Sequence, residues 1–282
     1  MPVPLLPGLF LVATPIGTAR DITLRALDVL AAADILAAED TRNTRRLLDI
    51  HAIAPGARKI VAYHDHNGAA QRPKLLAAIA AGQSVAYVSD AGTPMVSDPG
   101  YTLARAVIDA GMMVTAVPGA SAMLAALTVG GLPTDQFFFA GFLPTRTGAR
   151  VRFLNELKDV PGTLVFYENP KRVGKSLMNM VEVLGGDRKV ALCRELTKKF
   201  EDVRRGTLTD LARDYATQVP KGEIVVLVGA GRKTVASDAD IETALRLLLA
   251  QGAHTKDAAR DVAVTLEVSR RRVYALALSI KD

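Results

Sequence analysis

The chain has 282 residues, of which 49% are hydrophobic and 23% are charged. A chain of this length is too long to fold around one small hydrophobic core, so we expect two or three modules. Its hydrophobic runs are short and interrupted, so none approaches the roughly 20 apolar residues that cross a bilayer. Cys193 is the only cysteine, which excludes an internal disulfide and a cysteine-based zinc cluster. Because residues 1–4 also lack the basic start of a signal peptide, we expect a cytoplasmic protein without membrane association.

The net charge of +6 is unevenly distributed along the chain. Residues 1–140 carry 10 Lys/Arg against 11 Asp/Glu, whereas residues 141–210 carry 14 against 9 and residues 232–282 carry 9 against 7. A neutral first module followed by basic segments is typical of a small-molecule module joined to parts that contact a polyanion. The alternative is that mild basicity merely keeps the protein in solution.

Residues 1–118 alternate short β-rich runs with helical patterns, which predicts a first α/β domain with a mostly parallel sheet and helices on both faces. Thr41 suits the N-cap of the second helix, and Gly82 suits the end of the third. The expected strands are 9–13, 34–38, 59–63, 84–89 and 114–117, and the expected helices are 24–32, 41–50, 69–81 and 100–110.

Residues 119–231 predict a second α/β domain, in which some strands pair antiparallel. Residues 229–237 are small and polar, which is typical of a linker. The expected helices are 120–129, 146–157, 171–184 and 209–216, and the expected strands are 136–142, 163–167, 189–194, 201–208 and 223–228.

Residues 232–282 predict a helical tail with helices at 241–251, 256–266 and 269–279. The short connection before the last helix is typical of a helix-turn-helix unit, and Ser269 suits its N-cap. The first turn of that helix, where a recognition helix makes its contacts, holds three basic residues that we expect to bind nucleic acid. The alternative is a helical hairpin that packs on the body or on a second subunit. The three residues are Arg270, Arg271 and Arg272.

Polar or Gly/Pro-rich segments follow all five expected strands of the first domain. Because ligands bind beyond the carboxyl ends of strands in open parallel sheets, five such segments at one edge predict a ligand site. Gly92 and Gly119 let the main chain approach a flat ligand closely. The first of these loops is not Gly-x-Gly-x-x-Gly, and the full phosphate-loop motif Gly-x-x-x-x-Gly-Lys-Ser/Thr does not occur, because Gly174-Lys175-Ser176 lacks the earlier glycine. Both absences argue against a dinucleotide or ATP, and a neutral nucleoside would suit the site. The segments are 14–17, 39–42, 64–67, 89–100 and 118–122.

These segments resemble the tetrapyrrole methylase superfamily, whose members use S-adenosylmethionine as methyl donor. Within it, the sequence is similar to the branch that methylates the ribose 2′-oxygen of a decoding-centre cytidine in 16S rRNA, and the tail resembles the helix-turn-helix appendage of that branch. Thr93 stands where pigment-modifying members carry the acid of a Gly-Asp-Pro motif. The matching stretches are 12–17, 38–42, 64–67, 89–100, 118–122, 166–168, 194–198 and 221–223.

The resemblance implies two α/β domains with the donor in the cleft between them, a homodimer, no metal, and 16S rRNA or the small ribosomal subunit as partner. Two alternatives stay open: a small-molecule methylase of the pigment type, and a DNA-binding regulator that senses a nucleoside. The donor-binding residues that the resemblance implies are Pro15, Asp90, Ala91, Gly92, Thr93, Val96, Ser121, Ala122 and Tyr167.

A ribose hydroxyl is a weak nucleophile, so a general base would help methyl transfer, typically by about 10²–10⁴-fold. His64 and His66 are candidates because histidine accepts a proton near neutral pH, and both would point the same way if a strand continued through them; alternatively they cap the strand or bind phosphate. Asp40 and Glu39 are candidates unless they serve as carboxylates at a helix N-terminus. Lys198 would be a base only if desolvated, and a phosphate contact or a surface salt bridge is the alternative.

Basic side chains outside the tail are expected to contact the RNA backbone, with a solvated charged face as the alternative. Two of them lie one turn apart on the second helix, and four supply much of the charge excess of the second domain. The six are Arg42, Arg45, Arg146, Arg150, Lys171 and Arg172.

Overall fold

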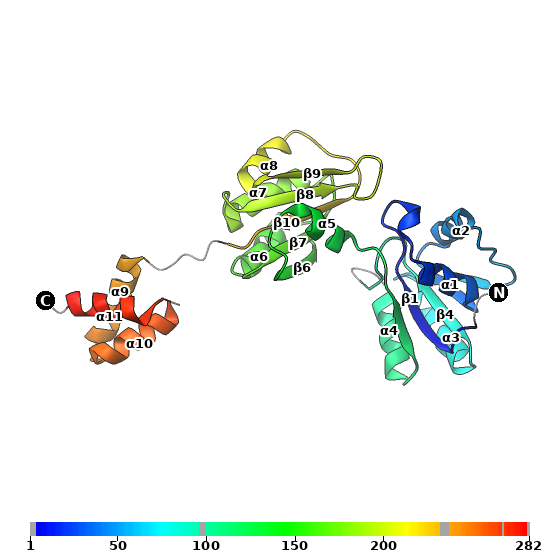
Figure 1. The fold of residues 1–282 in the computed structure, drawn as a ribbon, viewed down its shortest axis with the longest axis horizontal. Helices are drawn as coiled ribbons and strands as arrows, with labels where there is room; N and C mark the ends of the chain where they lie inside the picture. Colours follow the sequence, from blue (N-terminus) through cyan, green and yellow to red (C-terminus); the bar gives the residue numbers. More distant parts are fainter. Residues whose placement is uncertain (1–3, 96–99, 232–236, 267, 281–282) are drawn as a thin grey trace. The chain divides into compact units, whose positions relative to one another are not determined.

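A computed structural model of the chain describes residues 4–95, 100–231, 237–266 and 268–280, so Val96 lies outside the described residues. The chain divides into two compact units, Met1–Gly231 and Arg232–Asp282 (Figure 1). The domain boundary expected between residues 118 and 119 falls within the first unit and stays a prediction.

The first half of the larger unit is built on a five-stranded sheet in which every pairing is parallel. The strand order is β3-β2-β4-β1-β5, which confirms the fold class that the βα rhythm predicts. The elements are β1 (Gly8–Val12), η1 (Ala19–Asp21), α1 (Leu24–Ala32), β2 (Ile35–Ala38), α2 (Thr41–Ile50), β3 (Lys59–Ala62), α3 (Gly68–Ala80), β4 (Ser84–Val88), α4 (Gly100–Asp109) and β5 (Val114–Val117).

Alternate side chains of each strand of this sheet enter different cores, as the two-residue period of a strand requires. Leu9 and Tyr87 pack with α3 and α4 on one face. Phe10 and Ala86 pack with α1 and α2 on the other. Both faces of the sheet are therefore buried, which is why its strands read as nearly continuous hydrophobic runs.

The second half contains a mixed sheet in the order β6-β7-β10-β8-β9, with β6 and β7 parallel and the other pairs antiparallel. Helices α6, α7 and α8 cover one face, and α5 covers the other. The elements are α5 (Ala122–Gly130), β6 (Phe137–Phe142), α6 (Thr147–Leu157), β7 (Thr163–Glu168), α7 (Val173–Leu184), β8 (Lys189–Arg194), β9 (Asp202–Thr207), α8 (Leu208–Asp214) and β10 (Ile224–Val228).

The smaller unit is a group of three helices, α9 (Asp238–Ala250), α10 (Thr255–Thr265) and α11 (Arg270–Ser279), with its own buried core (Figure 1). Ile241 from α9 and Val273 from α11 are fully buried there. This unit therefore has the apolar centre that a separately folding module needs.

Capping residues that the sequence analysis overlooked account for two differences at helix N-termini. Helix α9 starts at Asp238 rather than at 241 because Ser237 and Asp240 form a capping box. The N-cap of α2 is Asp40 rather than Thr41, since the Asp40 carboxylate accepts the Arg42 backbone N–H. Boundary errors of this size follow from local hydrogen bonds that the hydrophobic period does not report.

The sheet of the first half changes its direction of winding between β1 and β4. The chain leaves β1 for β2, which lies beyond β4, and later leaves β4 for β5, which lies beyond β1. The loops after the adjacent strands β1 and β4 therefore lead in opposite directions. This place is called the switch point of the sheet, and it is where open α/β sheets bind ligands.

A carboxylate fastens the N-terminal ends of two neighbouring strands. Asp34, just before β2, accepts the backbone N–H and the hydroxyl of Ser84 at 2.8 and 2.6 Å, and its own N–H donates to the Ser84 hydroxyl at 3.1 Å. The bonds from Ser84 outweigh burial and lower the pKa of Asp34 below its ordinary value of 3.8.

Asp34→Asn should lower the free energy of unfolding by about 1 kcal/mol near neutral pH, because an amide accepts weaker bonds and solvent screens this exposed site. Since the folded-state pKa lies below the unfolded one, the wild-type advantage is complete above about pH 5 and shrinks as pH falls through the folded value. Urea denaturation at neutral and acid pH measures the difference, with Asp28→Asn on the exposed side of α1 as control. An advantage that grows toward acid pH would contradict this account.

Candidate functional site

The loops after β1 and β4 are joined by main-chain hydrogen bonds at the switch point. Thr14 and Gly92 donate their N–H groups to each other's carbonyl, both at 3.0 Å. The Thr14 hydroxyl donates to the Ser89 carbonyl at 3.1 Å, and the Ser89 hydroxyl donates to the Gly92 carbonyl at 2.7 Å. Gly92 has φ of +77°, a conformation that a side chain strains. The two loops therefore form one rigid platform.

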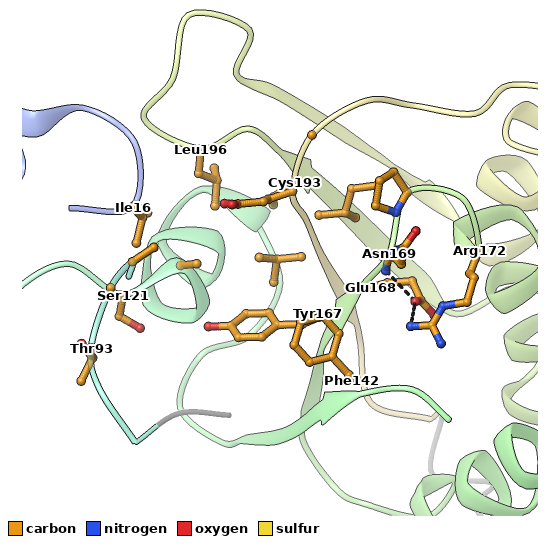
Figure 2. A pocket seen from close by; sticks show the side chains of 18 residues that line it. Ile16, Thr93, Ser121, Phe142, Tyr167, Glu168, Asn169, Arg172, Cys193 and Leu196 are labelled. Atoms are coloured by element: carbon orange, nitrogen blue, oxygen red, sulfur yellow. Dashed lines mark hydrogen bonds and ion pairs between the residues drawn. The ribbon is translucent and has the colours of Figure 1, made fainter. Parts of the chain in front are cut away.

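A cavity of about 400 Å³ opens on this platform. One wall comes from the first half of the larger unit and from the start of α5, and the other from the ends of β6, β7, β8 and β10 (Figure 2). The first wall contains Ile16, Ala91, Gly92, Thr93, Ser121 and Ala122. The second contains Phe142, Tyr167, Glu168, Asn169, Pro170, Arg172, Cys193, Leu196, Gly222, Glu223, Ile224 and Val225.

Six of the predicted donor residues line this cavity. Pro15 and Asp90 directly precede the lining residues Ile16 and Ala91, and Val96 lies outside the described residues. Donor binding by these residues stays a prediction, but the structure brings the six to one cavity from positions as far apart as Ala91 and Tyr167. The six are Ala91, Gly92, Thr93, Ser121, Ala122 and Tyr167.

The base of the cavity is apolar. Ile16 and Leu196 are each 7% exposed and pack in one cluster with Cys193 and Val225. Burial raises the pKa of the Cys193 thiol to about 11, so the thiol stays neutral and behaves as a small hydrophobic side chain. This surface suits a flat, uncharged ring.

Tyr167 crosses the cavity from β7 toward the start of α5 (Figure 2). Its ring makes edge contacts with Phe139 and Phe142, at centroid distances of 5.0 and 5.5 Å. Burial raises the pKa of the phenol although the Met123 backbone N–H, which donates to it, acts in the opposite direction. Tyr167 is therefore neutral, and both its ring and its hydroxyl are held in place.

Glu168 is a buried carboxylate in the second wall, and the sequence analysis did not assign it to the site. It is 3% exposed and accepts the Asn169 N–H at 2.6 Å and the Ser176 hydroxyl at 2.5 Å. The Arg172 guanidinium pairs with it at 2.8 Å. A buried charge of this kind requires such partners, so the cluster fixes the turn between β7 and α7.

Thr93 replaces the acid of the pigment-type motif and has a defined structural role. Its hydroxyl donates to the Ala120 carbonyl at 2.9 Å, which ties the loop after β4 to the segment that starts α5. An ionised carboxylate has no proton to donate at this position. The local geometry therefore depends on a hydroxyl and differs from that expected of an Asp.

Carboxylates at the rim of the first wall connect the loops after β2 and β4. The Asp40 N–H donates to the Asp90 carboxylate at 2.9 Å, and the Asp90 N–H donates to the Glu39 carboxylate at 3.3 Å. The hydrogen bond from the Arg42 side chain lowers the pKa of Asp40 to about 2. Asp40 is thus a weak base that caps α2, which is the alternative considered for it.

Lys198 does not have the properties of a general base. Its ammonium group pairs with Glu195 at 3.0 Å and with Glu223 at 3.2 Å. Burial lowers its pKa, but the contacts with these carboxylates outweigh burial and raise it overall. The raised pKa disfavours Lys198 as a base near neutral pH, and its two ion pairs agree with the salt-bridge alternative.

The strand does not continue through the two histidines, so the condition under which both side chains would point the same way is not met. Strand β3 ends at Ala62, and the Asn67 side chain accepts the His64 N–H at 2.9 Å and donates to the Ala62 carbonyl at 3.0 Å, which closes a turn. The His64 and His66 rings still lie 5.9 Å apart. The Nδ1 atom of His64 is buried without a hydrogen-bond partner among the described residues. Neither ring lines the cavity.

Arg150 is unsuited to the RNA contact expected of it. It is 2% exposed, and its guanidinium donates to the Asn179 side chain at 2.9 Å, to the carbonyls of Pro144 and Thr145 at 3.2 Å, and to the Thr147 hydroxyl at 3.3 Å. With four of its five N–H donors bonded to the protein and a side chain that is buried, Arg150 is poorly placed to reach a phosphate.

The other basic candidates are more accessible. Arg172 is turned to Glu168 in the cavity wall, and Arg272 pairs with Asp238 at 2.6 Å. RNA binding by the exposed members stays a prediction. These exposed residues are Arg42, Arg45, Arg146, Lys171, Arg270 and Arg271.

The residues that the structure describes lack two features. No group of three His, Cys, Asp or Glu side chains in them is placed to hold a metal ion. Among their helices, none combines the length and the apolar character needed to cross a membrane.

Comparison with known proteins agrees with this architecture. A family model for tetrapyrrole (corrin/porphyrin) methylases matches residues 8–212, and a model for the RsmI C-terminal HTH domain matches residues 235–281. The structure of a uroporphyrin-III C-methyltransferase from Thermus thermophilus, complexed with S-adenosylhomocysteine, shares the fold with a TM-score of 0.54 and 21% identity. That match covers 80% of this chain and 97% of the other.

Curated relatives match over nearly the full length. A ribosomal RNA small subunit methyltransferase I from Mesorhizobium japonicum is 53% identical over 280 residues, which are 99% of this chain and 94% of the relative. A protein of the same name from Synechocystis is 39% identical, covering 97% of this chain and 98% of the relative.

Two α/β halves with a cavity at the switch point define a protein of the tetrapyrrole methylase class. The chain belongs to that family and, within it, to the group named ribosomal RNA small subunit methyltransferase I.

Arg150→Ala should lower the free energy of unfolding by about 2–4 kcal/mol, because it removes a buried side chain together with its hydrogen bonds to the Asn179 amide and to the carbonyls of Pro144 and Thr145. Urea denaturation measures the loss. Arg146→Ala, at the exposed start of the same helix, is the matched control and should change stability by no more than about 0.5 kcal/mol. Similar stability losses for both variants would contradict the internal role of Arg150.

Proposed function

We propose that this protein transfers a methyl group from S-adenosylmethionine to the 2′-oxygen of a cytidine ribose in the decoding centre of 16S rRNA. The observation that carries the proposal is the cavity at the switch point, with a main-chain wall around Gly92 and an apolar base at Ile16 and Leu196. It occurs in a chain whose relatives are named for methylation of small-subunit ribosomal RNA.

The cavity has the features that the methyl donor requires. Its volume of about 400 Å³ lies in the range of sites that enclose a molecule of that size. The apolar base offers a surface for a purine ring, and the glycine loop offers main-chain groups at close range. The neutral forms of Cys193 and Tyr167 avoid a charge beside the ring. A structural relative that is complexed with S-adenosylhomocysteine has the same fold.

The acceptor is inferred from the charge pattern and the tail. Exposed basic residues border the second half of the larger unit, and two exposed arginines start α11 in the unit that matches a helix-turn-helix model. Phosphate contacts of this kind orient a nucleic acid without reading its sequence. A small ribosomal subunit or its 16S rRNA would be the partner, which places the reaction in the cytoplasm, and a homodimer is the expected assembly.

S-adenosylmethionine supplies a methyl group made electrophilic by its sulfonium. A lone pair of the ribose 2′-oxygen forms the new bond to carbon, while the electrons of the carbon–sulfur bond go to sulfur and the hydroxyl proton leaves to a base or to water. The contribution of the protein is alignment, since the rigid platform at Thr14 and Gly92 and the fixed Tyr167 hold the site open for an in-line approach.

Two of the five candidates for the general base are disfavoured by their pKa values. The low pKa of Asp40 and the raised pKa of Lys198 both argue against proton acceptance near neutral pH. Of the predicted candidates, His64, His66 and Glu39 remain, and the unpartnered Nδ1 atom gives His64 a free position for a proton or a phosphate oxygen.

Incubation with radiolabelled S-adenosylmethionine and either small ribosomal subunits, free 16S rRNA or a tetrapyrrole precursor tests the function. Label should enter RNA, and nuclease digestion should release it as 2′-O-methylcytidine. Label in a base-methylated nucleoside would contradict the ribose as acceptor. Label in the pigment alone would contradict an RNA acceptor and favour the small-molecule alternative.

Gly92→Ala should weaken binding of S-adenosylhomocysteine about tenfold. The new Cβ would lie 3.1 Å from the Ile16 side chain, and the backbone conformation disfavours any side chain. Gly82→Ala is the matched control, because Gly82 has φ of +88° with nothing within 4 Å of an added Cβ. Isothermal titration calorimetry should show weaker binding for Gly92→Ala only, and equal affinities for both variants would contradict the site.

A further inference from the structure

The turn of residues 195–198, between β8 and β9, has an unusual backbone. Glu195 and Thr197 have φ of +51° and +64°, although neither is a glycine. Residues with side chains adopt this left-handed conformation only where the surrounding structure compensates for the strain, and such positions concentrate at functional sites. We refer to residues 195–198 as the clasp.

The first support of the clasp is the loop after β1. The Thr18 N–H donates to the Thr197 hydroxyl at 3.1 Å, and the Thr18 hydroxyl donates to the Thr197 carbonyl. Gly17 is required for this approach, since an added Cβ would lie 2.5 Å from Cγ of Lys198 and 2.6 Å from the Thr197 hydroxyl. The two segments are therefore in direct contact, although they are separated by 179 positions in the sequence.

The second support is the segment before β10. The Glu195 N–H donates to the Glu223 carbonyl at 3.0 Å, and the Glu223 N–H donates to the Glu195 carboxylate at 2.9 Å. The Lys198 ammonium pairs with both carboxylates. At Gly222 an added Cβ would overlap the Glu195 carboxyl group. The hydrogen bond from Glu223, with help from Lys198, lowers the pKa of Glu195, so the network stays ionised at neutral pH.

The residue held between these supports faces the cavity. Leu196 is 7% exposed, lines the cavity, and belongs to the same apolar cluster as Ile16. Figure 2 shows Ile16 and Leu196 at the cavity. Ile16 is two residues from Thr18, so one loop supplies both the cavity wall and the hydrogen bonds to the clasp. The clasp therefore determines the position of Leu196 relative to Ile16 in the cavity wall.

We propose that the clasp is a positioning element for the methyl donor: the Thr18–Thr197 hydrogen bonds hold Leu196 against Ile16, so that the apolar base of the cavity is formed before the donor binds. The proposal rests on the proposed function, because it concerns the same cavity. Thr18 and Thr197 act through Leu196 and Ile16 and need no contact with the donor. A preformed site binds more tightly because less ordering accompanies binding.

The test uses Thr18→Val and Thr197→Val, which remove one hydroxyl each and keep the side-chain shape. Each should weaken binding of S-adenosylhomocysteine by about three- to tenfold in isothermal titration calorimetry, the usual effect of one lost hydrogen bond. Thr209→Val is the matched control, because its hydroxyl also joins two segments, donating to the Gly186 carbonyl at 3.0 Å away from the cavity. The control should keep the wild-type affinity.

Kinetics separate positioning from a general loss of stability. With small ribosomal subunits as acceptor, the clasp variants should raise KM for the donor and keep kcat at saturating donor, while their melting temperatures match that of Thr209→Val. Unchanged donor affinity in both clasp variants, or an equal loss in the control, would overturn the proposal. Failure of the wild-type protein to bind S-adenosylhomocysteine would instead overturn the proposed function.

Discussion

The main-chain bridge between Thr14 and Gly92 is the constraint on which the site depends. Two strands that lie side by side send their chains in opposite directions, and the loops would separate without a bond between them. The bridge uses both backbone groups of each residue, and the buried hydroxyls of Thr14 and Ser89 reinforce it. Water has little access to these bonds, so they hold the platform more firmly than exposed contacts do.

The second wall of the cavity is stabilised by ion pairs as well as by main-chain hydrogen bonds. Glu168 is buried and is paired with Arg172 and Ser176, so removal of either partner would leave the buried carboxylate with less compensation for its charge. The clasp adds a second network around Glu195. The cavity thus lies between a hydrogen-bonded platform and an ion-paired wall, and its apolar base connects them.

Much of the fold could be predicted from the sequence. The spacing of hydrophobic residues indicates which side chains of a helix or strand are buried, and glycines indicate where helices and strands end. Helices α1 and α2 begin and end at the predicted residues. The loops after β1, β4 and β5 met as expected, since the carboxyl ends of parallel strands share an edge. Glu168 was missed because a buried acid looks like any other acid in a sequence, and Arg150 was misassigned because a basic residue does not show whether its partners are internal.

The polar residues first considered for catalysis have largely structural partners, and this bears on how the protein accelerates its reaction. Asp40 caps a helix and pairs with Arg42, and Lys198 joins two carboxylates. These contacts lower the pKa of Asp40 and raise that of Lys198, which argues against proton exchange by either group near neutral pH. In a site where the reactive methyl group arrives already activated, alignment and exclusion of water can supply more acceleration than proton transfer. A cavity built from rigid loops and a strained clasp provides alignment of this kind.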